Sequence, residues 1–311
     1  MNPNLDISIV VPVYRSQDNL LELYQRIKAV LLSEQMSFEI LFVEDCGGDN
    51  SWEIIKSIAA EDSHVRGLRM SRNFGQHNAL LAGIREARGV FTLTLDDDLQ
   101  HPPEEIPTLL SCIQGGFDVV YGAPEYQHHG LFRDLASLVA KIALQSAMGA
   151  ETARQISAFR VFRTELRKAF ERYGSPSVNI DVLLTWATNR FSAITVKHYQ
   201  RKNGESGYSI RKLVRHTMNM MTGFSTLPLK IASIIGFIFA FFGLFVLLYV
   251  LTRFFFSGDS VPGFPFLASI IAIFSGAQLL ALGLIGEYLA RMYQRTMERP
   301  VYHVIEETKT M

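Results

Sequence analysis

The sequence predicts an α/β protein with a doubly wound, mainly parallel sheet, followed by a C-terminal hairpin of two membrane-spanning helices. Between residues 7 and 95, apolar β-rich runs alternate with segments of helical periodicity, and short loops join them. Such alternation is typical of parallel strands connected by crossover helices. Beyond residue 230, two runs without charged side chains are each long enough to cross a bilayer.

Buried strands and helices are expected in regular order along the N-terminal part of the chain. The strands are residues 7–13, 38–43, 65–70 and 90–95, and the helices carry apolar side chains over residues 20–31, 52–58 and 78–87. In sheets of this class, ligands bind beyond the carboxyl ends of the strands. Acidic clusters at residues 44–49 and 96–98 follow the second and fourth strands. We therefore expect both clusters to share one cleft.

The run Asp96, Asp97 and Asp98 places three mutually repelling carboxylates at the end of a buried strand. A hard divalent cation, Mg²⁺ or Mn²⁺, takes oxygen ligands and would relieve this repulsion while leaving room for substrate phosphates. Side chains alternate along an extended backbone, so Asp96 and Asp98 are predicted to point the same way and Asp97 away. The alternative interpretation is a solvated acidic turn before a helix that begins at Pro102 and Pro103.

Two uncharged runs near the C-terminus predict a membrane hairpin. The first, residues 231–252, would span roughly 33 Å at ~1.5 Å per residue, which covers a bilayer core. The second is predicted over residues 264–286, after two prolines. The flanking cations are Lys230, Arg291, Arg295 and Arg299. The positive-inside rule therefore places both termini in the cytoplasm. Two buried helices of a soluble domain are the less favoured alternative at this length.

Residues 209–229, just before the first span, predict an amphipathic helix that lies in the membrane interface. Apolar residues recur on one side, and the cations Arg211, Lys212 and Arg215 gather on the other. An ordinary surface helix packed on the domain is the alternative. Glycines and cations in the preceding residues 201–209 would allow that segment to wrap an anion.

The composition argues against several other classes of protein. The 30 basic and 30 acidic residues give a net charge of zero, whereas a nucleic-acid-binding protein shows a strong basic excess. No GxGxxG follows the first strand and no GxxxxGK[ST] occurs, so a Rossmann dehydrogenase and a P-loop NTPase are poorly supported. Cys46 and Cys112 are expected to be free thiols, and no spacing of Cys and His indicates zinc.

Several short motifs occur in an order and spacing that are specific when taken together. They are Val11-Pro12-Val13-Tyr14, Arg72-Asn73-Phe74-Gly75-Gln76, Asp96-x-Asp98-Leu99-Gln100-x-Pro102, Phe159-Arg160, Arg201-x-x-Gly204-x-Ser206, residues 224–229, Gly286-Glu287-Tyr288 and Arg299-Pro300. The chain thereby resembles, over nearly its whole length, the family 2 glycosyltransferases that load a sugar onto a polyprenyl phosphate. It is similar to bacterial undecaprenyl-phosphate glycosyltransferases and dolichyl-phosphate mannose synthases.

The resemblance implies a GT-A, Rossmann-like catalytic domain and a division of the chain into four regions. The cytoplasmic GT-A domain covers residues 1–208, the interfacial helix 209–229, the two transmembrane helices 230–290, and a cytoplasmic tail 291–311. The implied location is the bacterial inner membrane, and a homo-oligomer is compatible with it.

The resemblance also assigns roles to particular residues. The nucleotide sugar is expected on Pro12, Tyr14, Glu44, Asp45, Arg72 and Asp96, and the catalytic set is Asp96, Asp98 and Gln100. Asp98, with Asp96 nearby, is expected to hold Mg²⁺ or Mn²⁺. The acceptor phosphate is expected on Arg133, Ser137 and Arg201.

The chain departs from the family pattern around the donor. Arg15-Ser16 replaces the usual Asn-Glu, and Glu44-Asp45-Cys46-Gly47 replaces the usual Asp-Asp-Gly-Ser. Asp97 replaces a small residue between the two metal-motif aspartates, and Ala158 stands where Gly or Asp is common. These changes leave the reaction class intact and the donor sugar open.

The implied reaction is one in-line displacement of a nucleoside diphosphate by the lipid phosphate, with inversion at the anomeric carbon. A phosphate monoester has its second pKa near ~6 and is largely dianionic at neutral pH, so it needs no strong general base. A processive polysaccharide synthase is an alternative, although its Gln-x-x-Arg-Trp motif and additional spans are not visible. A membrane protein that binds a nucleotide sugar without turning it over is the other alternative.

Overall fold

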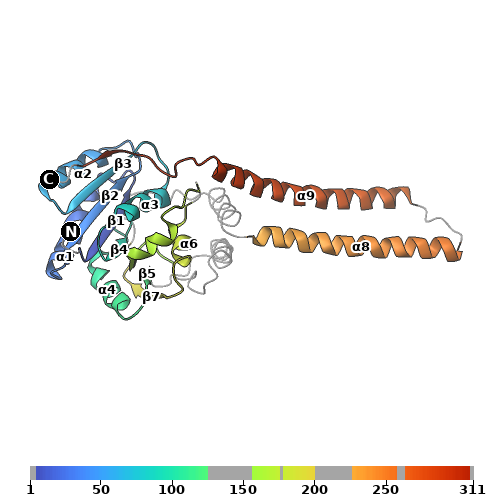
Figure 1. The fold of residues 1–311 in the computed structure, drawn as a ribbon, viewed down its shortest axis with the longest axis horizontal. Helices are drawn as coiled ribbons and strands as arrows, with labels where there is room; N and C mark the ends of the chain where they lie inside the picture. Colours follow the sequence, from blue (N-terminus) through green and yellow to red (C-terminus); the bar gives the residue numbers. More distant parts are fainter. Residues whose placement is uncertain (1–4, 125–155, 176–177, 200–225, 258–262, 309–311) are drawn as a thin grey trace. The chain divides into compact units, whose positions relative to one another are not determined.

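The computed structural model describes residues 5–124, 156–175, 178–199, 226–257 and 263–308. The chain divides into two compact units (Figure 1). The first comprises Met1–Leu213 together with Glu298–Met311, and the second comprises Val214–Met297. The first unit holds the sheet, and the second holds two long helices.

Within the described residues, the first unit is built on an eight-stranded sheet in the order β7-β5-β6-β4-β1-β2-β3-β8. The strands are β1 (Ile7–Val13), β2 (Phe38–Glu44), β3 (Val65–Met70), β4 (Phe91–Thr94), β5 (Val119–Pro124), β6 (Arg160–Arg163), β7 (Phe191–Val196) and β8 (Val304–Glu307). β1 pairs in parallel with β2 and β4, and β3 continues the parallel set beyond β2. β6 and β8 run antiparallel to their neighbours. The prediction of a mainly parallel sheet is confirmed.

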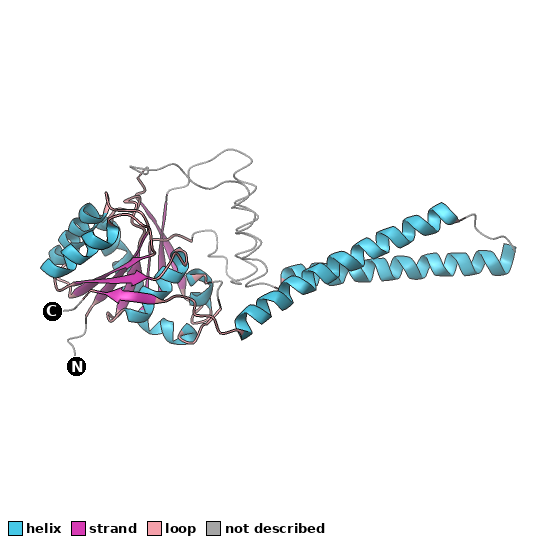
Figure 2. Ribbon diagram, turned by 90° about the horizontal axis from the view of Figure 1, so that it is seen from above, coloured by secondary structure: helices cyan, strands magenta, loops and turns pink. Residues whose placement is uncertain are grey.

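Helices cover both faces of this sheet (Figure 2). Apolar side chains of α1 (Leu20–Ser33), α2 (Ser51–Glu61) and α4 (Ile106–Gln114) belong to one hydrophobic cluster, and those of α3 (Gln76–Glu86) and α6 (Ile180–Thr185) belong to a second. Short 3-10 turns occupy Pro103–Glu105 and Thr164–Phe170. The four strands and three helices predicted before residue 96 are all present, close to their predicted bounds. The arrangement is therefore doubly wound.

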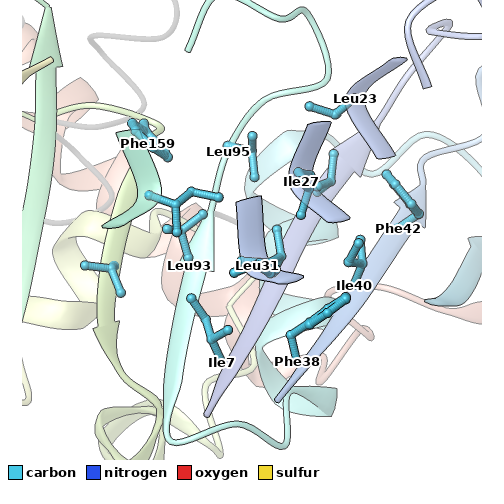
Figure 3. Packing of buried hydrophobic residues seen from close by; sticks show 14 of the residues in the cluster. Ile7, Leu23, Ile27, Leu31, Phe38, Ile40, Phe42, Leu93, Leu95 and Phe159 are labelled. Carbon is cyan, nitrogen blue, oxygen red and sulfur yellow. The ribbon is translucent and has the colours of Figure 1, made fainter. Parts of the chain in front are cut away.

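The alternation of side chains along β1 explains its mostly apolar sequence. Ile9 and Val11 belong to the first cluster, whereas Val10 belongs to the second, so β1 is buried on both faces. In the first cluster, Leu23 and Ile27 of α1 lie against the apolar side chains of the strands (Figure 3). Their spacing of four residues keeps both on the same side of the helix.

α3 approaches the sheet closely at Gly83. A Cβ atom at this position would lie 2.4 Å from Val10 Cγ1 and 3.0 Å from Val43 Cγ2, so only glycine fits without displacing the strands. This contact fixes the depth of α3 on the sheet. It thereby fixes the N-terminal turn of α3, which begins with Gln76 beside the acidic run.

The C-terminal residues differ from the prediction of a tail over residues 291–311. Residues up to Thr296 continue a helix, and β8 joins the sheet as an edge strand antiparallel to β3. The first unit thus includes residues from both sides of the apolar region, and the division into four functional regions stays a prediction. Four residues without hydrophobic alternation carry no periodic signal, so the sequence did not reveal this strand.

The second unit consists of α8 (Leu227–Ser257) and α9 (Phe264–Thr296), which contact each other through Phe242 and Phe274, among others. Within the described residues, the stretches Pro228–Thr252 and Ile273–Thr296 are long and apolar enough to cross a membrane, with mean hydropathy of 2.8 and 1.4. Both helices extend beyond the predicted spans. In α9 an ion pair one turn apart, Arg291 to Glu287 at 2.7 Å, supports the helix past its uncharged part.

Candidate active site

The carboxyl ends of β1, β2 and β4 lie side by side, because β1 pairs in parallel with both neighbours. The loops that follow these strands contain residues 14–16, 45–50 and 95–102. The two acidic clusters predicted from the sequence therefore meet at one edge of the sheet. A further loop, residues 71–75 after β3, is joined to them by hydrogen bonds.

The acidic run 96–98 lies in a turn, because β4 ends at Thr94. The predicted alternation of side chains assumed an extended backbone, and that premise is wrong. Asp97 Oδ2 accepts hydrogen bonds from the Tyr14 amide at 3.0 Å and from the Ser16 hydroxyl. Asp97 therefore joins the acidic turn to the loop after β1.

Asp96 is a carboxylate whose pKa is strongly altered. Its Oδ1 accepts a hydrogen bond from Gln76 Nε2 at 2.6 Å. Burial raises the pKa of Asp96 to about 7, and repulsion from Asp98 and Asp97 adds to the rise, against the attraction of Arg160. Nearby positive charge thus balances only part of the negative charge of the acidic cluster.

Asp96 and Asp98 remain the candidates for a divalent metal, since Asp97 is engaged with the neighbouring loop. Asp98 Oδ1 accepts the amide of Gln100 at 3.1 Å, which holds this carboxylate within the turn. Among the residues that the structure describes, no three His, Cys, Asp or Glu side chains form a complete ligand shell. Two crowded carboxylates without such a shell fit Mg²⁺ or Mn²⁺, which usually bind through one or two carboxylates plus substrate phosphates.

The carboxylates after β2 shape the loops around them. Asp45 accepts the amides of Phe74 at 2.7 Å and Gly75 at 2.8 Å, one on each oxygen. Burial raises the pKa of Asp45, and these two amides act in the opposite direction. Glu44 Oε1 accepts the amide of Gly47 at 2.6 Å. Both side chains are buried, so their predicted contact with the nucleotide stays a prediction.

The loops after β1 and β2 are locked together at Arg15 and Gly47. Arg15 Nε donates to Gly47 O at 3.0 Å, and the guanidinium lies 5.3 Å from the centre of the Tyr14 ring. A Cβ atom at Gly47 would lie 2.7 Å from Arg15 N, so the approach requires glycine there. Tyr14 is 45% exposed, which leaves its ring accessible to a ligand.

The other predicted donor and catalytic residues lie at the same edge with different exposure. Arg72 is exposed, and its guanidinium lies 4.5 Å from the centre of the Phe74 ring. Gln100 is half-buried, and its carbonyl accepts the Tyr199 amide at 2.8 Å. Pro12, in contrast, is buried within β1.

Each of the four loops at this edge contains at least one residue with a left-handed backbone. They are Arg15 (φ 56°), Cys46 (φ 53°), Gly75 (φ 95°) and Leu99 (φ 60°). For a residue with a side chain, this conformation costs on the order of 1 kcal/mol. Strained backbone of this kind concentrates at functional sites, where surrounding contacts hold it in place.

Replacing Cys46 by Gly is expected to raise the free energy of unfolding by up to about 1 kcal/mol, because glycine adopts φ near +53° without steric cost. Thermal and urea unfolding of the purified protein would measure the change. Cys46→Ala is the matched control, since it removes the thiol and keeps the Cβ. Equal stability of the two variants would contradict the strain at this position.

A buried ion pair lies beneath the acidic turn. Arg160 on β6 and Asp181 on α6 are 2% and 5% exposed and form a salt bridge. Asp181 also accepts the Tyr121 hydroxyl at 3.0 Å, and Arg160 Nε donates to Thr94 Oγ1 at 3.0 Å. Thr94 is the last residue of β4, so the pair anchors the strand end from which the acidic turn departs. The resemblance included Arg160 without a role, and no local pattern pointed to Asp181.

His101 is a second site residue that the sequence analysis did not single out. It is buried next to the acidic turn, and its Nε2 lies 3.2 Å from the Ser157 hydroxyl. Its ring contacts that of His198 edge to face, with the centres 5.0 Å apart. Burial lowers the pKa of His101 to about 4, and nearby His198 lowers it further, while Asp98 acts in the opposite direction.

We expect His101 to make the protein acid-sensitive. Its folded pKa of about 4 lies below the ordinary value near ~6.5, so the unfolded state binds the proton more strongly. The contribution of His101 to the free energy of unfolding is therefore fully present above pH ~6.5. It decreases by up to about 3 kcal/mol as the pH falls towards ~4. Unfolding measured between these pH values should show a smaller loss in His101→Gln. The exposed His303→Gln is the control, and equal slopes in all three proteins would contradict the expectation.

The predicted acceptor residues Arg133, Ser137 and Arg201, and most of the interfacial helix over residues 209–229, lie outside the described residues. Cys46 and Cys112 are free thiols, as predicted.

The sequence of the chain matches a known protein family. Residues 8–171 match the model of glycosyl transferase family 2, which is more than half of the chain. The chain belongs to glycosyl transferase family 2. This assignment confirms the predicted resemblance and the prediction of a glycosyltransferase, and it argues against the non-catalytic alternative.

Curated relatives of this family 2 glycosyltransferase cover almost its full length. An undecaprenyl-phosphate 4-deoxy-4-formamido-L-arabinose transferase of Shewanella sediminis is 37% identical over 97% of this chain and 93% of its own. A transferase of the same name from Yersinia enterocolitica is 36% identical over 96% of this chain and 92% of its own.

Solved structures of more distant proteins share the fold. Glucosyl-3-phosphoglycerate synthase from Mycobacterium tuberculosis, in complex with Mn²⁺, UDP and glucosyl-3-phosphoglycerate, matches with a TM-score of 0.51 and 14% identity over 70% of this chain and 78% of that chain. TarS 1-349 from S. aureus, in complex with UDP-GlcNAc, matches with a TM-score of 0.50 and 18% identity over 70% of this chain and 66% of that chain. These matches confirm the predicted GT-A fold of the first unit.

Proposed function

We propose that this family 2 glycosyltransferase transfers a sugar from a nucleotide diphosphate sugar to a polyprenyl phosphate, such as undecaprenyl phosphate, at the cytoplasmic face of the membrane. The observation that carries the proposal is the acidic turn 96–98 at the carboxyl edge of a family 2 sheet, in a chain that also has two long apolar helices. The names of the curated relatives support the lipid acceptor.

The carboxylates support a metal-assisted departure of the diphosphate. Asp96 and Asp98 would hold Mg²⁺ or Mn²⁺, which would offset the charge on the departing diphosphate. Asp97 would keep the acidic turn against the loop that carries Tyr14. The acceptor phosphate arrives already ionised, so the protein has to position it with cations rather than deprotonate it. Arg133, Ser137 and Arg201 are proposed for that task.

The chain path supports one orientation in the membrane. The sheet contains β1 to β7 from before the apolar hairpin and β8 from after it, so both ends of the hairpin return to the same folded unit. A hairpin that crosses twice has both ends on one face. Lys230 and Arg295 flank the apolar stretches, and the positive-inside rule makes that face the cytoplasmic one.

A screen of purified protein with radiolabelled nucleotide sugars and undecaprenyl phosphate would test the proposal. The names of the relatives make 4-deoxy-4-formamido-L-arabinose the first candidate sugar, and the complexes of the fold neighbours make uridine diphosphate its first candidate carrier. We expect a labelled lipid product that requires Mg²⁺ or Mn²⁺ and disappears with EDTA. Absence of any lipid-linked product with every donor would refute the proposal, and a growing polymer would favour the processive alternative.

The product is expected to have the anomeric configuration opposite to that of the donor. A single displacement by the lipid phosphate inverts the carbon, and the carboxylates of the acidic turn are committed to the metal or to the loop after β1. NMR of the purified lipid product would measure the configuration. Retention, or a trapped glycosyl-enzyme, would contradict the single displacement.

A further inference from the structure

The residues that follow α9 dock along the sheet edge beside the candidate donor site. Val301 is buried in the second hydrophobic cluster, and the Tyr302 ring lies 5.5 Å from the Arg85 guanidinium. β8 then pairs with β3, and the Thr308 hydroxyl accepts the Gly67 amide at 2.8 Å. Residues 300–308 are therefore an integral part of the catalytic unit.

Glu306 of β8 is linked to the buried carboxylate of Glu44 through one arginine, Arg69. Glu306 Oε2 accepts Trp52 Nε1 at 3.0 Å and lies 3.6 Å from Arg69 Nη1. The Nε of the same Arg69 lies 3.5 Å from Glu44 Oε2. The pairing of β3 with β8 shifts register between Arg69 and Met70, and such irregularities redirect side chains. Arg69 thus lies between the carboxylate of Glu306 on the edge strand and the carboxylate of Glu44 at the candidate site.

Glu44 is the residue of this chain of contacts that lies at the candidate donor site. Its Oε1 accepts the Gly47 amide, while its Oε2 is buried and has no hydrogen-bond partner in the described structure. A buried acceptor in this state is costly unless a ligand supplies a donor. Base amides and ribose hydroxyls of a nucleotide are such donors. The Nε atom of Arg69 lies 3.5 Å from this oxygen, so the guanidinium forms an ion pair with the Glu44 carboxylate.

A second connection runs along the backbone. The Ser71 amide donates to His303 O at 2.9 Å, at the start of the loop 71–75. That loop supplies the two amides that hold Asp45, and Gln76 directly after it donates to Asp96. The segment after α9 is therefore hydrogen-bonded to the loop that contacts both acidic clusters.

We propose that residues 300–308 form one wall of the donor site, in which Glu306 is a positioning residue that holds Arg69, and Arg69 holds Glu44 for contact with the nucleotide. The inference rests on the proposed function, because it concerns binding of the donor. Its consequence is that the chain leaving the apolar hairpin sets the affinity for the nucleotide. It predicts no direct effect on the lipid acceptor.

The experiment is calorimetric titration of UDP with MnCl₂ into the detergent-solubilised full chain. Glu306→Gln keeps an acceptor for Trp52 but removes the negative charge that pairs with Arg69, so UDP should bind about three- to fivefold more weakly. Arg69→Met should weaken binding further, because it also leaves Glu44 without its cation. Glu61→Gln, at the exposed end of α2 and outside residues 300–308, is the control and should leave UDP affinity unchanged. The KM for undecaprenyl phosphate should not move in any variant.

A double variant separates positioning from simple loss of stability. If Glu306 acts through Arg69, Arg69→Met combined with Glu306→Gln should bind UDP no more weakly than Arg69→Met alone. Melting temperatures of all variants establish that they fold. Wild-type affinity in folded Glu306→Gln, or equal losses in donor affinity and lipid KM, would overturn the inference. Failure of the wild-type protein to bind UDP would instead overturn the proposed donor, and this inference with it.

Discussion

Replacing Asp98 by Asn is expected to reduce sugar transfer by about 10³-fold or more, equivalent to about 4 kcal/mol of activation free energy. A neutral amide is a poor ligand for Mg²⁺ or Mn²⁺, and it removes one of the charges that would hold the cation beside the diphosphate. The fold should be unaffected, because Asp98 is half-buried in a turn and accepts the local Gln100 amide. Turnover with donor and lipid, together with Mn²⁺ binding followed by electron paramagnetic resonance, would measure both consequences.

Asp18→Asn is the matched control for this substitution. Asp18 is an exposed carboxylate in the loop after β1, and its loss should leave both transfer and Mn²⁺ binding unchanged. Transfer by Asp98→Asn within a few-fold of the wild-type rate would refute the assignment of Asp98 to the metal.

The three neighbouring aspartates should respond differently, for reasons that only the structure supplies. Asp97 accepts the Tyr14 amide and the Ser16 hydroxyl, so its removal frees the loop after β1 rather than the metal. From the sequence, Asp97 is predicted to point away from Asp96 and Asp98, on the assumption of an extended backbone. A turn after a short strand is not distinguishable from a longer strand by apolar pattern alone, since Leu95 continues the hydrophobic run.

The elements whose signal is local were predicted well. β1 and β2 are buried on both faces and are mostly apolar, and α1 has its apolar residues at helical spacing. The acidic clusters met at one edge because parallel pairing of β1 with β2 and β4 aligns their carboxyl ends. Strand order and short loops were enough to predict this meeting.

The features that the sequence did not reveal depend on contacts between distant residues. β8 pairs with β3 across more than half of the chain and has no alternating pattern of its own. The two oxygens of Asp45 accept amides from a loop that follows another strand, which no local pattern indicated, and its contact with the nucleotide stays a prediction. Charged residues buried in the sheet, such as Arg160, are defined by partners that lie far away in the sequence.

Replacing Asp181 by Asn is expected to destabilise the catalytic unit by about 3–5 kcal/mol, the largest effect on stability that the structure predicts. The change leaves the buried Arg160 guanidinium without its ion-pair partner, while its hydrogen bond to Thr94 stays. Arginine does not release its proton at accessible pH, so this charge cannot be neutralised. Urea unfolding of the purified protein would measure the loss.

Replacing Arg160 should destabilise the protein less than replacing Asp181, and the double substitution should show why. In Arg160→Met, the Asp181 carboxyl can take up a proton and keep its hydrogen bond with Tyr121, which lowers the penalty of burying it. The double variant Arg160→Met with Asp181→Leu buries no charge, so it should unfold less easily than Asp181→Asn alone. Additive losses across the set would contradict a coupled pair. Because Arg160 also anchors Thr94 at the end of β4, the double variant should regain stability without regaining full transfer activity: the acidic turn would depart from a strand end that no longer has its guanidinium anchor.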